Sequence, residues 1–364
     1  MTVPLFINGR FLTQPLSGMQ RYAEELIGAL DRLLGQDSGL KAGLAPCVLV
    51  PHGALRQPAW DHIPVRRVGI LRGHAWEQTE LAFAARRGLL LNLAAAAPLL
   101  HRRSILVLHD AAIFAHPHHF ARAYRAVHRW LRPRIARGAL RLITISEFSR
   151  RELARWCGVP EAAFTIIGDS AEHILHHPAD STVLARHGLE PGRYVLTVGN
   201  QSPNKNIALA VAAFTRAAPE GWTLAVAGGG HARIFGAAEE TQEQGACYLG
   251  RVTDGELRAL YEGAGLLLFP SRYEGFGVPP LEAMALGCPV LSSDASAMPE
   301  VLGDAAAYFP SDDSLAAAGR LRGLINDAGR RADLAARGRA RAGQYTWAAG
   351  AERLARLLAG AAAQ

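Results

Sequence analysis

The segment 266–293 constrains the fold more than any other part of the chain. It opens with the apolar run Leu266-Leu-Leu-Phe-Pro, continues into the loop Glu274-Gly-Phe-Gly-Val-Pro-Pro-Leu-Glu282, and resumes with the extended Pro289-Val-Leu-Ser-Ser. The two prolines preset a first helical turn, and a glycine before the last run suits a helix end. The order strand, glycine loop, helix, strand is typical of a parallel sheet that carries a ligand loop at a strand's carboxyl end.

Two glutamates frame this loop. Glu274 and Glu282 at this spacing recur by chance in long chains, so the surrounding pattern carries the interpretation. Gly275 and Gly277 allow close approach of backbone to a ligand, and the helix start that follows can receive an anion. A ligand with phosphates at one end and hydroxyl groups on either side has this layout, as a sugar nucleotide does.

The rest of the chain repeats the alternation of strand and helix. In the second half we expect strands at Tyr194–Gly199, Thr223–Gly228, Cys247–Gly250, Leu266–Phe269, Val290–Ser293 and Ala306–Phe309. In the first half we expect strands at Val3–Ile7, Cys47–Val50, Leu89–Asn92, Ile105–His109 and Leu140–Ile145, with helices at Gly18–Leu34 and His118–Arg137. The fold class predicted is α/β, with two doubly wound parallel sheets. The polar stretch His173–Pro191 suggests the joint, and the last helix, Trp347–Leu358, could pack on either domain.

Length and composition fit an enzyme of two domains. The 364 residues exceed what one core usually serves, and 49% hydrophobic with 20% charged residues is ordinary for a globular protein. The four cysteines lack metal-type spacing and read as thiols of a reducing compartment. The start lacks a basic region, and the apolar tract Leu81–Leu100 is interrupted by Arg86 and Arg87, so we expect neither a signal peptide nor a spanning helix.

The net charge of +7 is concentrated in one region. Between His101 and Pro160 twelve arginines stand against three acidic residues. Apolar residues at Phe120, Tyr124, Val127 and Leu131 recur at helical spacing with arginines between them. This basic amphipathic helix is equally compatible with a solvated face and with contact of Arg122 to Arg141 with anionic lipid or a phosphate-bearing acceptor. Nucleic acid is not expected as a partner, because no recognised binding module accompanies the charge.

Three further loops after predicted strands carry distinctive chemistry. Ser17-Gly18-Met-Gln-Arg-Tyr opens a helix, where Gly18 is either an ordinary helix start or a close approach to phosphate. Lys205, one of two lysines in the chain, stands just before a helix and suits a diphosphate. His109 and Asp110 end a strand, where they either bond sugar hydroxyls or form a buried pair that caps local backbone.

Other histidines cluster without convincing partners and read as surface residues: His116, His118, His119, His173, His176 and His177. No Asp-x-Asp pair occurs in the chain, so no metal site is predicted.

These motifs together make the chain similar to the retaining glycosyltransferases of family 4, in the GT-B fold, and to their mannosyltransferase-like branch in bacterial polysaccharide assembly. The resemblance covers Phe6 to about Leu358 and implies two facing Rossmann-like domains. Its domain boundaries would be 1–180 for the acceptor domain, 181–345 for the nucleotide-sugar domain and 346–364 for a C-terminal helix that crosses back.

The resemblance also implies a role for each site residue. Glu274 would bind hydroxyls of the transferred sugar and Glu282 the ribose. Lys205 would neutralise the diphosphate, and His109, supported by Asp110, would lie near the bond that breaks. The remaining contacts to the nucleotide-sugar would come from Gly18, Asn200, Ser202, Arg251, Gly275, Phe276 and Gly277. Transfer with retention and without a metal or cofactor would follow, with GDP-mannose as the leading donor and a UDP-sugar as the alternative.

The chain departs from the family's pattern at one loop. Many members place an arginine shortly before the lysine, where this chain has Asn200, Gln201, Ser202 and Asn204. Neutral hydrogen bonds from Asn200 and Ser202 would be weaker than charge-assisted ones.

Two other classes of function stay in view. A protein that binds a sugar nucleotide without transferring it would keep the same residues, and only loss of the donor would distinguish the two. Hydride transfer on a nicotinamide is disfavoured, because Gly228-Gly-Gly-His-Ala-Arg is not a Gly-x-Gly-x-x-Gly turn and reads better as a strand end. The location expected is cytoplasmic, with peripheral contact to the inner membrane.

Overall fold

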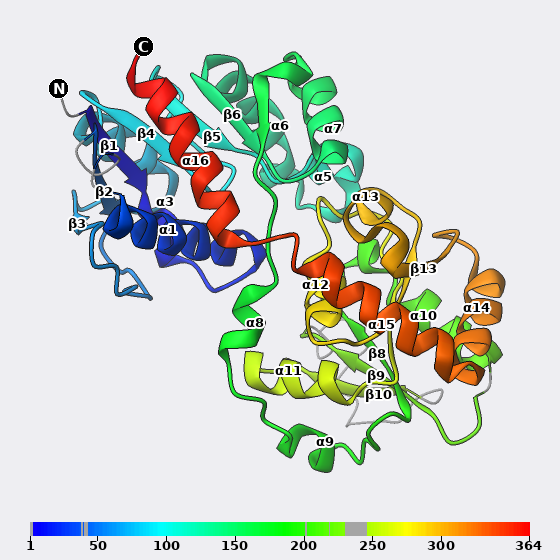
Figure 1. Ribbon diagram of the computed structural model, residues 1–364. Coiled ribbons are helices and arrows are strands. Elements are labelled where there is room, and N and C mark those ends of the chain that lie inside the picture. The colour runs from blue at the N-terminus through cyan, green and yellow to red at the C-terminus, as the bar shows by residue number, and fades with distance from the viewer. Residues whose placement is uncertain (1–2, 38, 40–42, 201, 218, 230–245) are drawn as a thin grey trace. The chain divides into compact units, whose positions relative to one another are not determined.

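A computed structural model describes residues 3–37, 39, 43–200, 202–217, 219–229 and 246–364 (Figure 1). The chain forms two compact units. Unit 1 holds the chain up to Asp169 together with Thr346–Gln364, and unit 2 is Ser170–Tyr345. The stretch that suggested a joint, His173–Pro191, therefore lies within unit 2.

Unit 1 contains a parallel sheet of seven strands in the order β3-β2-β1-β4-β5-β6-β7. Its strands are β1 Val3–Asn8, β2 Leu44–Val50, β3 Val65–Arg67, β4 Leu89–Asn92, β5 Ser104–Val107, β6 Arg141–Thr144 and β7 Phe164–Ile166. Strands β4 and β5 are buried along their whole length, as expected for runs of leucine, isoleucine and valine covered on both faces. From β1 the strand order runs through β2 to β3 on one side and through β4 to β7 on the other, so the winding of the sheet reverses between β1 and β4.

All the described α-helices of unit 1 except the C-terminal one lie between these strands in the chain. The helices are α1 Gly18–Gln36, α3 Gly73–Trp76, α4 Ala82–Ala84, α5 Ala112–Ala115, α6 Arg122–Gly138, α7 Glu147–Cys157 and α16 Trp347–Ala362. A π-helical turn, Glu77–Leu81, joins α3 to α4. The C-terminal α16 lies beside α1 (Figure 1), where the rings of Tyr22 and Trp347 meet edge to face at 5.6 Å. Both rings are buried, so the last helix completes the core of the first unit.

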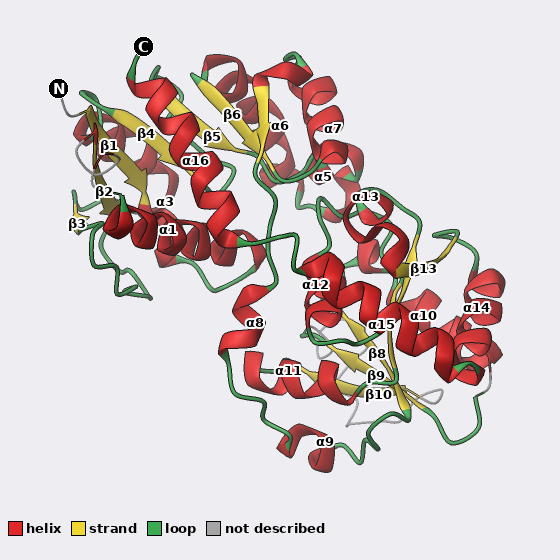
Figure 2. Ribbon diagram, viewed as in Figure 1, coloured by secondary structure: helices red, strands yellow, loops and turns green. Residues whose placement is uncertain are grey.

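Unit 2 contains a parallel sheet of six strands in the order β10-β9-β8-β11-β12-β13. Its strands are β8 Tyr194–Val198, β9 Thr223–Ala227, β10 Ala246–Gly250, β11 Leu266–Phe269, β12 Val290–Ser293 and β13 Ala306–Phe309. Its helices are α8 Glu172–His176, α9 Thr182–Arg186, α10 Ile207–Ala217, α11 Asp254–Gly263, α12 Val278–Ala285, α13 Met298–Leu302, α14 Ser314–Asn326 and α15 Ala328–Ala342. Figure 2 shows the strands of each unit among these helices. The winding reverses between β8 and β11, and such a reversal opens a crevice at the carboxyl ends of the strands.

The fold class is confirmed, and the strands expected in unit 2 are present with bounds that shift by at most one residue. In unit 1 two strands were missed. Val65–Arg67 at one edge is exposed and carries two arginines, and Phe164–Ile166 at the other edge has only three residues. Short edge strands of this kind lack the apolar run that marks a buried strand.

The interpretation of α6 needs correction. Tyr124 and Val127, expected on the apolar face, are 44% and 52% exposed, whereas His128 and Arg132 are buried. The face that packs on the core includes Leu131 and Ile135, so aromatic and apolar residues share the outer face with arginines. No described helix is long and apolar enough to cross a membrane.

Candidate functional site

Lys205 and Glu274 meet at the carboxyl edge of the unit 2 sheet. Lys205 ends a short turn between β8 and α10, and Glu274 lies in the loop between β11 and α12. The Lys205 Nζ donates to Glu274 Oε1 at 2.6 Å, and the Ser271 hydroxyl donates to the same oxygen at 2.6 Å. Among the described residues Oε2 of Glu274 has no partner. The Glu274 carboxylate is therefore fixed through Oε1, and Oε2 can accept a hydrogen bond from a hydroxyl of a ligand.

Backbone contacts tie together the three loops that carry this pair. The Arg272 amide donates to the Asn204 carbonyl at 2.8 Å, which joins the loop after β11 to the loop after β8. The Glu274 amide donates to the Ser296 hydroxyl at 2.9 Å, which joins it to the loop after β12. These strands flank the point where the winding reverses, so the pair occupies the place where such sheets bind ligands.

The glycine loop ends in a helix start. Gly277 caps α12 with a positive φ of 93°, and a Cβ there would lie 2.3 Å from Met298 Cε, so no other residue fits without a shift. Gly275 and Phe276 are buried, and the Phe276 ring packs edge to face on Tyr345 at 5.3 Å. Pro279 and Pro280 have no N–H, and the Leu281 amide donates to the Gly277 carbonyl at 3.4 Å, so Val278 is the residue of the first turn of α12 that offers an amide at the positive end of the helix dipole. The loop can thus present backbone donors to an anion beside the lysine.

Glu282 lies in the second turn of α12 and is buried, with 6% of the residue exposed. Its Oε1 accepts a hydrogen bond from His173 Nε2 at 2.7 Å, and its Oε2 accepts one from the Tyr261 hydroxyl at 2.8 Å. Burial, followed by the charge of Glu282, raises the pKa of Tyr261 well above its ordinary value, so this hydroxyl stays protonated and donates. The prediction that His173 is a surface residue was wrong, whereas His118 and His176 are exposed as expected.

Two other predicted residues of unit 2 lie in the loop after β8. The side-chain oxygen of Asn200 accepts bonds from the amide and the hydroxyl of Ser202, at 3.3 and 2.6 Å. Both donors of Ser202 are therefore directed within the loop. Gln201 lies outside the described residues.

Arg251 follows β10 and is exposed. A Cβ on Gly229 would lie 3.5 Å from its Nε, so the arginine borders the loop after β9. Strand β9 ends at Ala227, and a Cβ on Gly228 would lie 1.8 Å from the Gly199 carbonyl oxygen. The glycines there end a strand and let two loops approach, while the rest of that run, from residue 230, lies outside the described residues.

In unit 1 the predicted residues lie at the carboxyl edge of its sheet. His109 is 6% exposed, and its Nε2 bonds the Leu93 carbonyl at 2.9 Å. Burial lowers the pKa of His109, which favours the neutral ring. The Asp110 carboxylate accepts from the Ala112 amide at 2.8 Å and so caps α5. Gly18 starts α1, and a Cβ there would meet no atom within 4 Å, so packing does not require a glycine.

A buried polar network at the same edge of unit 1 was not predicted. Asn8, at the end of β1, donates to Glu77 Oε1 at 2.7 Å and to Asn92 Oδ1, at the end of β4, at 3.0 Å. Arg10 and His74 also contact the Glu77 carboxylate, at 3.3 and 2.9 Å. Burial opposes ionisation, but the His74 hydrogen bond and the Arg10 charge together hold the pKa of Glu77 below its ordinary value. Asparagines at the ends of two neighbouring strands were the available signal.

Within the described ranges no group of three or more His, Cys, Asp or Glu side chains is placed to hold a metal ion. All four cysteines lie in the described part of the chain and none forms a disulfide, and Cys157 and Cys288 are buried.

Comparison with known proteins places this geometry in a family. The model of the family described as "Glycosyl transferases group 1" matches residues 183–341, which lie in unit 2. The O-antigen chain mannosyltransferase B of Escherichia coli is 33% identical over 256 residues, covering 67% of each chain.

Solved structures extend the likeness in fold to the whole chain. The sucrose-phosphate synthase of Thermosynechococcus elongatus superposes with a TM-score of 0.72 at 19% identity, covering 98% of both chains. The HepE protein of Anabaena, solved with UDP and glucose, gives 0.70 at 18% identity over 99% of this chain and all of that one. The two Rossmann-like units are thus those of the GT-B fold, and the chain belongs to the group 1 glycosyltransferases.

Proposed function

We propose that this glycosyltransferase moves a hexose, with retention of configuration and without a metal, from a nucleoside diphosphate to a glycan acceptor. The observation that carries the proposal is the Lys205–Glu274 pair beside the N-terminus of α12. A cation beside the Val278 amide at a helix start suits a departing diphosphate, and a carboxylate with one open oxygen suits sugar hydroxyls. Mannose from GDP-mannose is the favoured donor, because the relative that covers two thirds of the chain is named a mannosyltransferase.

The chemistry proposed needs stabilisation of the leaving group more than an activated nucleophile. An ammonium has three donors, and only one is used in the contact with Glu274, so two remain for phosphate oxygens. As negative charge develops on the diphosphate, Lys205 and the Val278 amide would stabilise it without moving. Gly275 and Gly277 would supply backbone donors, Glu282 the ribose contact and Arg251 the contact near the base.

Unit 1 would offer the acceptor. We assign to His109 a contact with the transferred sugar and to Gly18 an approach to phosphate. Asp110 would act on His109 through its charge, since its carboxylate caps Ala112.

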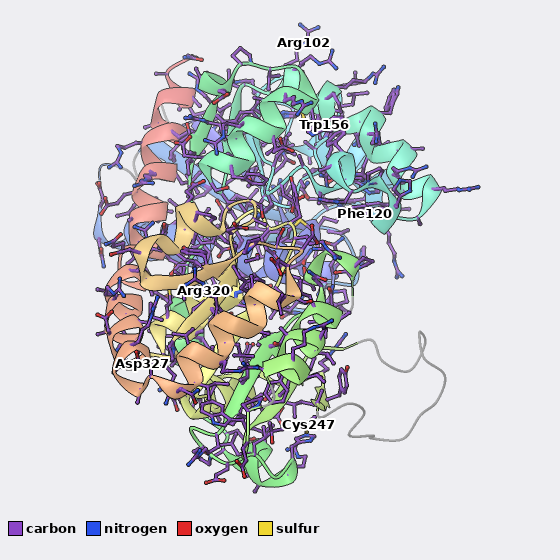
Figure 3. The ribbon with its side chains drawn as sticks, turned by 90° about the vertical axis from the view of Figure 1, so that its right-hand side faces the viewer. Arg102, Phe120, Trp156, Cys247, Arg320 and Asp327 are labelled. Atoms are coloured by element: carbon purple, nitrogen blue, oxygen red, sulfur yellow. The ribbon has the colours of Figure 1, made fainter. Side chains whose placement is uncertain are left out.

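The outer face of α6 supports a lipid-linked acceptor at the cytoplasmic face of a membrane. Trp130 is 50% exposed, and Arg134 lies over its ring at 4.3 Å. Phe83 and Leu100, 67% and 88% exposed, lie among Arg86, Arg102 and Arg103 on another surface of unit 1, and Figure 3 shows Arg102 extending away from the ribbon. Exposed aromatic and aliphatic side chains between arginines are the composition that binds anionic headgroups.

A donor panel tests the proposal. GDP-mannose, UDP-glucose and UDP-GlcNAc are incubated with the protein, with and without EDTA, and loss of donor is followed together with thermal stabilisation by each free diphosphate. Loss of GDP-mannose that EDTA does not slow is the expected result. Since water takes the sugar when no acceptor is present, the mannose released should be seen first as the α anomer by NMR. Binding without loss of any donor would instead favour a sugar-nucleotide-binding protein.

A UDP-sugar is the second candidate donor. The HepE structure, solved with UDP and glucose, favours it, although that protein shares only 18% identity with this chain. Selective stabilisation by UDP over GDP would decide for this candidate.

A further inference from the structure

We infer that His173, with Tyr261, positions the carboxylate of Glu282 to read the two hydroxyls of a nucleotide's ribose. The inference rests on the proposed function and adds two residues to the donor site. His173 lies on α8, 109 positions before Glu282 in the sequence, and it donates to Oε1 at 2.7 Å. Tyr261 lies on α11 and donates to Oε2 at 2.8 Å. The two donors hold the two oxygens from different helices, so the carboxylate cannot rotate without breaking a bond.

The number of remaining acceptor positions matches the ligand. An ionised carboxylate has about four lone-pair positions, two on each oxygen. One donor on each oxygen leaves one position free on each. Neighbouring hydroxyls of a ribose, each a donor, fit that pair of positions.

Helix α8 is itself fixed against α11, which keeps His173 in place. Arg258, one turn before Tyr261 on α11, donates to the carbonyls of Leu175 and His177 at 2.9 Å. The Ser170 hydroxyl, just before α8, donates to the Tyr345 carbonyl at 2.8 Å. The helix that carries His173 is thus held at both ends.

The His173 ring makes one polar contact among the described residues. It is 1% exposed, and its buried Nδ1 has no hydrogen-bond partner. A buried nitrogen without a partner disfavours the folded state, so stability alone gives a poor reason for histidine here. The bond to Glu282 both sets the Nε2–H tautomer and accounts for the residue.

The test compares ribose and deoxyribose nucleotides on matched variants. Affinities for GDP and 2′-deoxy-GDP, or for UDP and 2′-deoxy-UDP if uridine is the preferred base, are measured by calorimetry on the wild-type protein, His173→Ala, His173→Gln and Tyr261→Phe. We expect the wild type to bind the ribose nucleotide at least about tenfold more tightly than the deoxyribose nucleotide, which is the effect of one hydrogen bond to a charged group. His173→Ala and Tyr261→Phe should each lose most of that preference, with affinity for the deoxy form nearly unchanged, and the amide of His173→Gln should restore part of it.

His176→Ala is the control, because His176 is exposed on the same short helix and has the same chemistry. It should keep the wild-type preference. Equal losses for both nucleotides in His173→Ala and Tyr261→Phe, or an unchanged preference, would overturn the inference while leaving the proposed function intact. A wild-type protein that binds no nucleoside diphosphate would overturn the proposed function and this inference together. If His173→Ala does not fold, Tyr261→Phe, which removes a single oxygen, gives the same comparison.

Discussion

The carboxyl edges of the two sheets are built differently. In unit 2 a lysine and a glutamate from separate loops form an ion pair, and one glutamate oxygen stays open. In unit 1 the buried Glu77 is already bonded by Asn8, Arg10 and His74, and His109 is bonded to Leu93. The unit 2 edge keeps donors and acceptors that a ligand can use. At the unit 1 edge many of the polar side chains are bonded to other residues of the unit. We therefore expect changes at Lys205 and Glu274 to affect turnover and changes at Glu77 to affect stability.

The largest effect is expected from Lys205→Ala. Loss of one preorganised donor to a developing charge should lower kcat by about 100- to 1,000-fold, with unfolding by urea little changed. Arg216→Ala is the matched control, because Arg216 is an exposed cation in the last turn of α10, the helix that follows Lys205. Its turnover should stay within a few-fold of wild type, and a near-normal rate in Lys205→Ala would contradict the site assignment.

Glu77→Gln tests the other half of the comparison, the role of the unit 1 edge in stability. It leaves Arg10 and His74 beside a neutral group, and we expect a loss of about 1–3 kcal/mol in the free energy of unfolding at pH 7. Since the folded pKa of Glu77 is lowered from 4.5, its contribution is present above that pH and is lost as the pH falls through the folded pKa. The difference between wild type and variant in the free energy of unfolding, measured with urea, should therefore become smaller in acid. Glu352→Gln, an exposed carboxylate of unit 1, should show no such gap.

A smaller effect is expected for membrane contact. The double variant Val127→Ser, Trp130→Ser removes exposed apolar area from α6 and should weaken sedimentation with vesicles of phosphatidylcholine and phosphatidylglycerol about tenfold. Leu315→Ser, at a residue of unit 2 that is 73% exposed, serves as the control. Equal binding of all three proteins to the vesicles would remove α6 from the proposed membrane face.

The smallest effect is expected from Gly18→Ala. Because a Cβ there would meet nothing within 4 Å, stability should change by less than about 1 kcal/mol. The affinity for a nucleoside diphosphate should fall a few-fold if the backbone of Gly18 approaches phosphate. Isothermal titration with GDP or UDP separates this from an ordinary helix start, which would leave affinity unchanged.

The sequence predicted the part of the molecule that is encoded locally. The bounds of β11 and β12 match because each strand is a short apolar run set off by turn residues. The proximity of Lys205 and Glu274 could be anticipated, because parallel strands bring the loops after them to one edge. What could not be anticipated depends on packing between distant segments. His173 reaches Glu282 from 109 positions away, and nothing in its polar surroundings in the sequence indicates burial.

The same limit explains the error on α6. The spacing of apolar residues predicted an amphipathic helix, but which face is buried depends on the elements that pack against it. His128 and Arg132 are buried on the same helix as Leu131. In unit 1 the network around Glu77 joins the ends of β1 and β4 to a π-helical turn. The asparagines at the two strand ends are the one local signal of this network, and no local pattern indicates that Glu77 joins them.

The position of α16 bears on the order in which the units can mature during synthesis. Unit 2 is one uninterrupted stretch, so it can finish folding as soon as it has left the ribosome. Unit 1 begins earlier but must wait, because Trp347 closes over Tyr22 only after all of unit 2 has been made. Until then the face of α1 that α16 covers stays open to solvent. In the nascent chain, unit 2 can therefore finish folding before unit 1. A stall in synthesis after Tyr345 would leave a folded unit 2 attached to an incomplete unit 1.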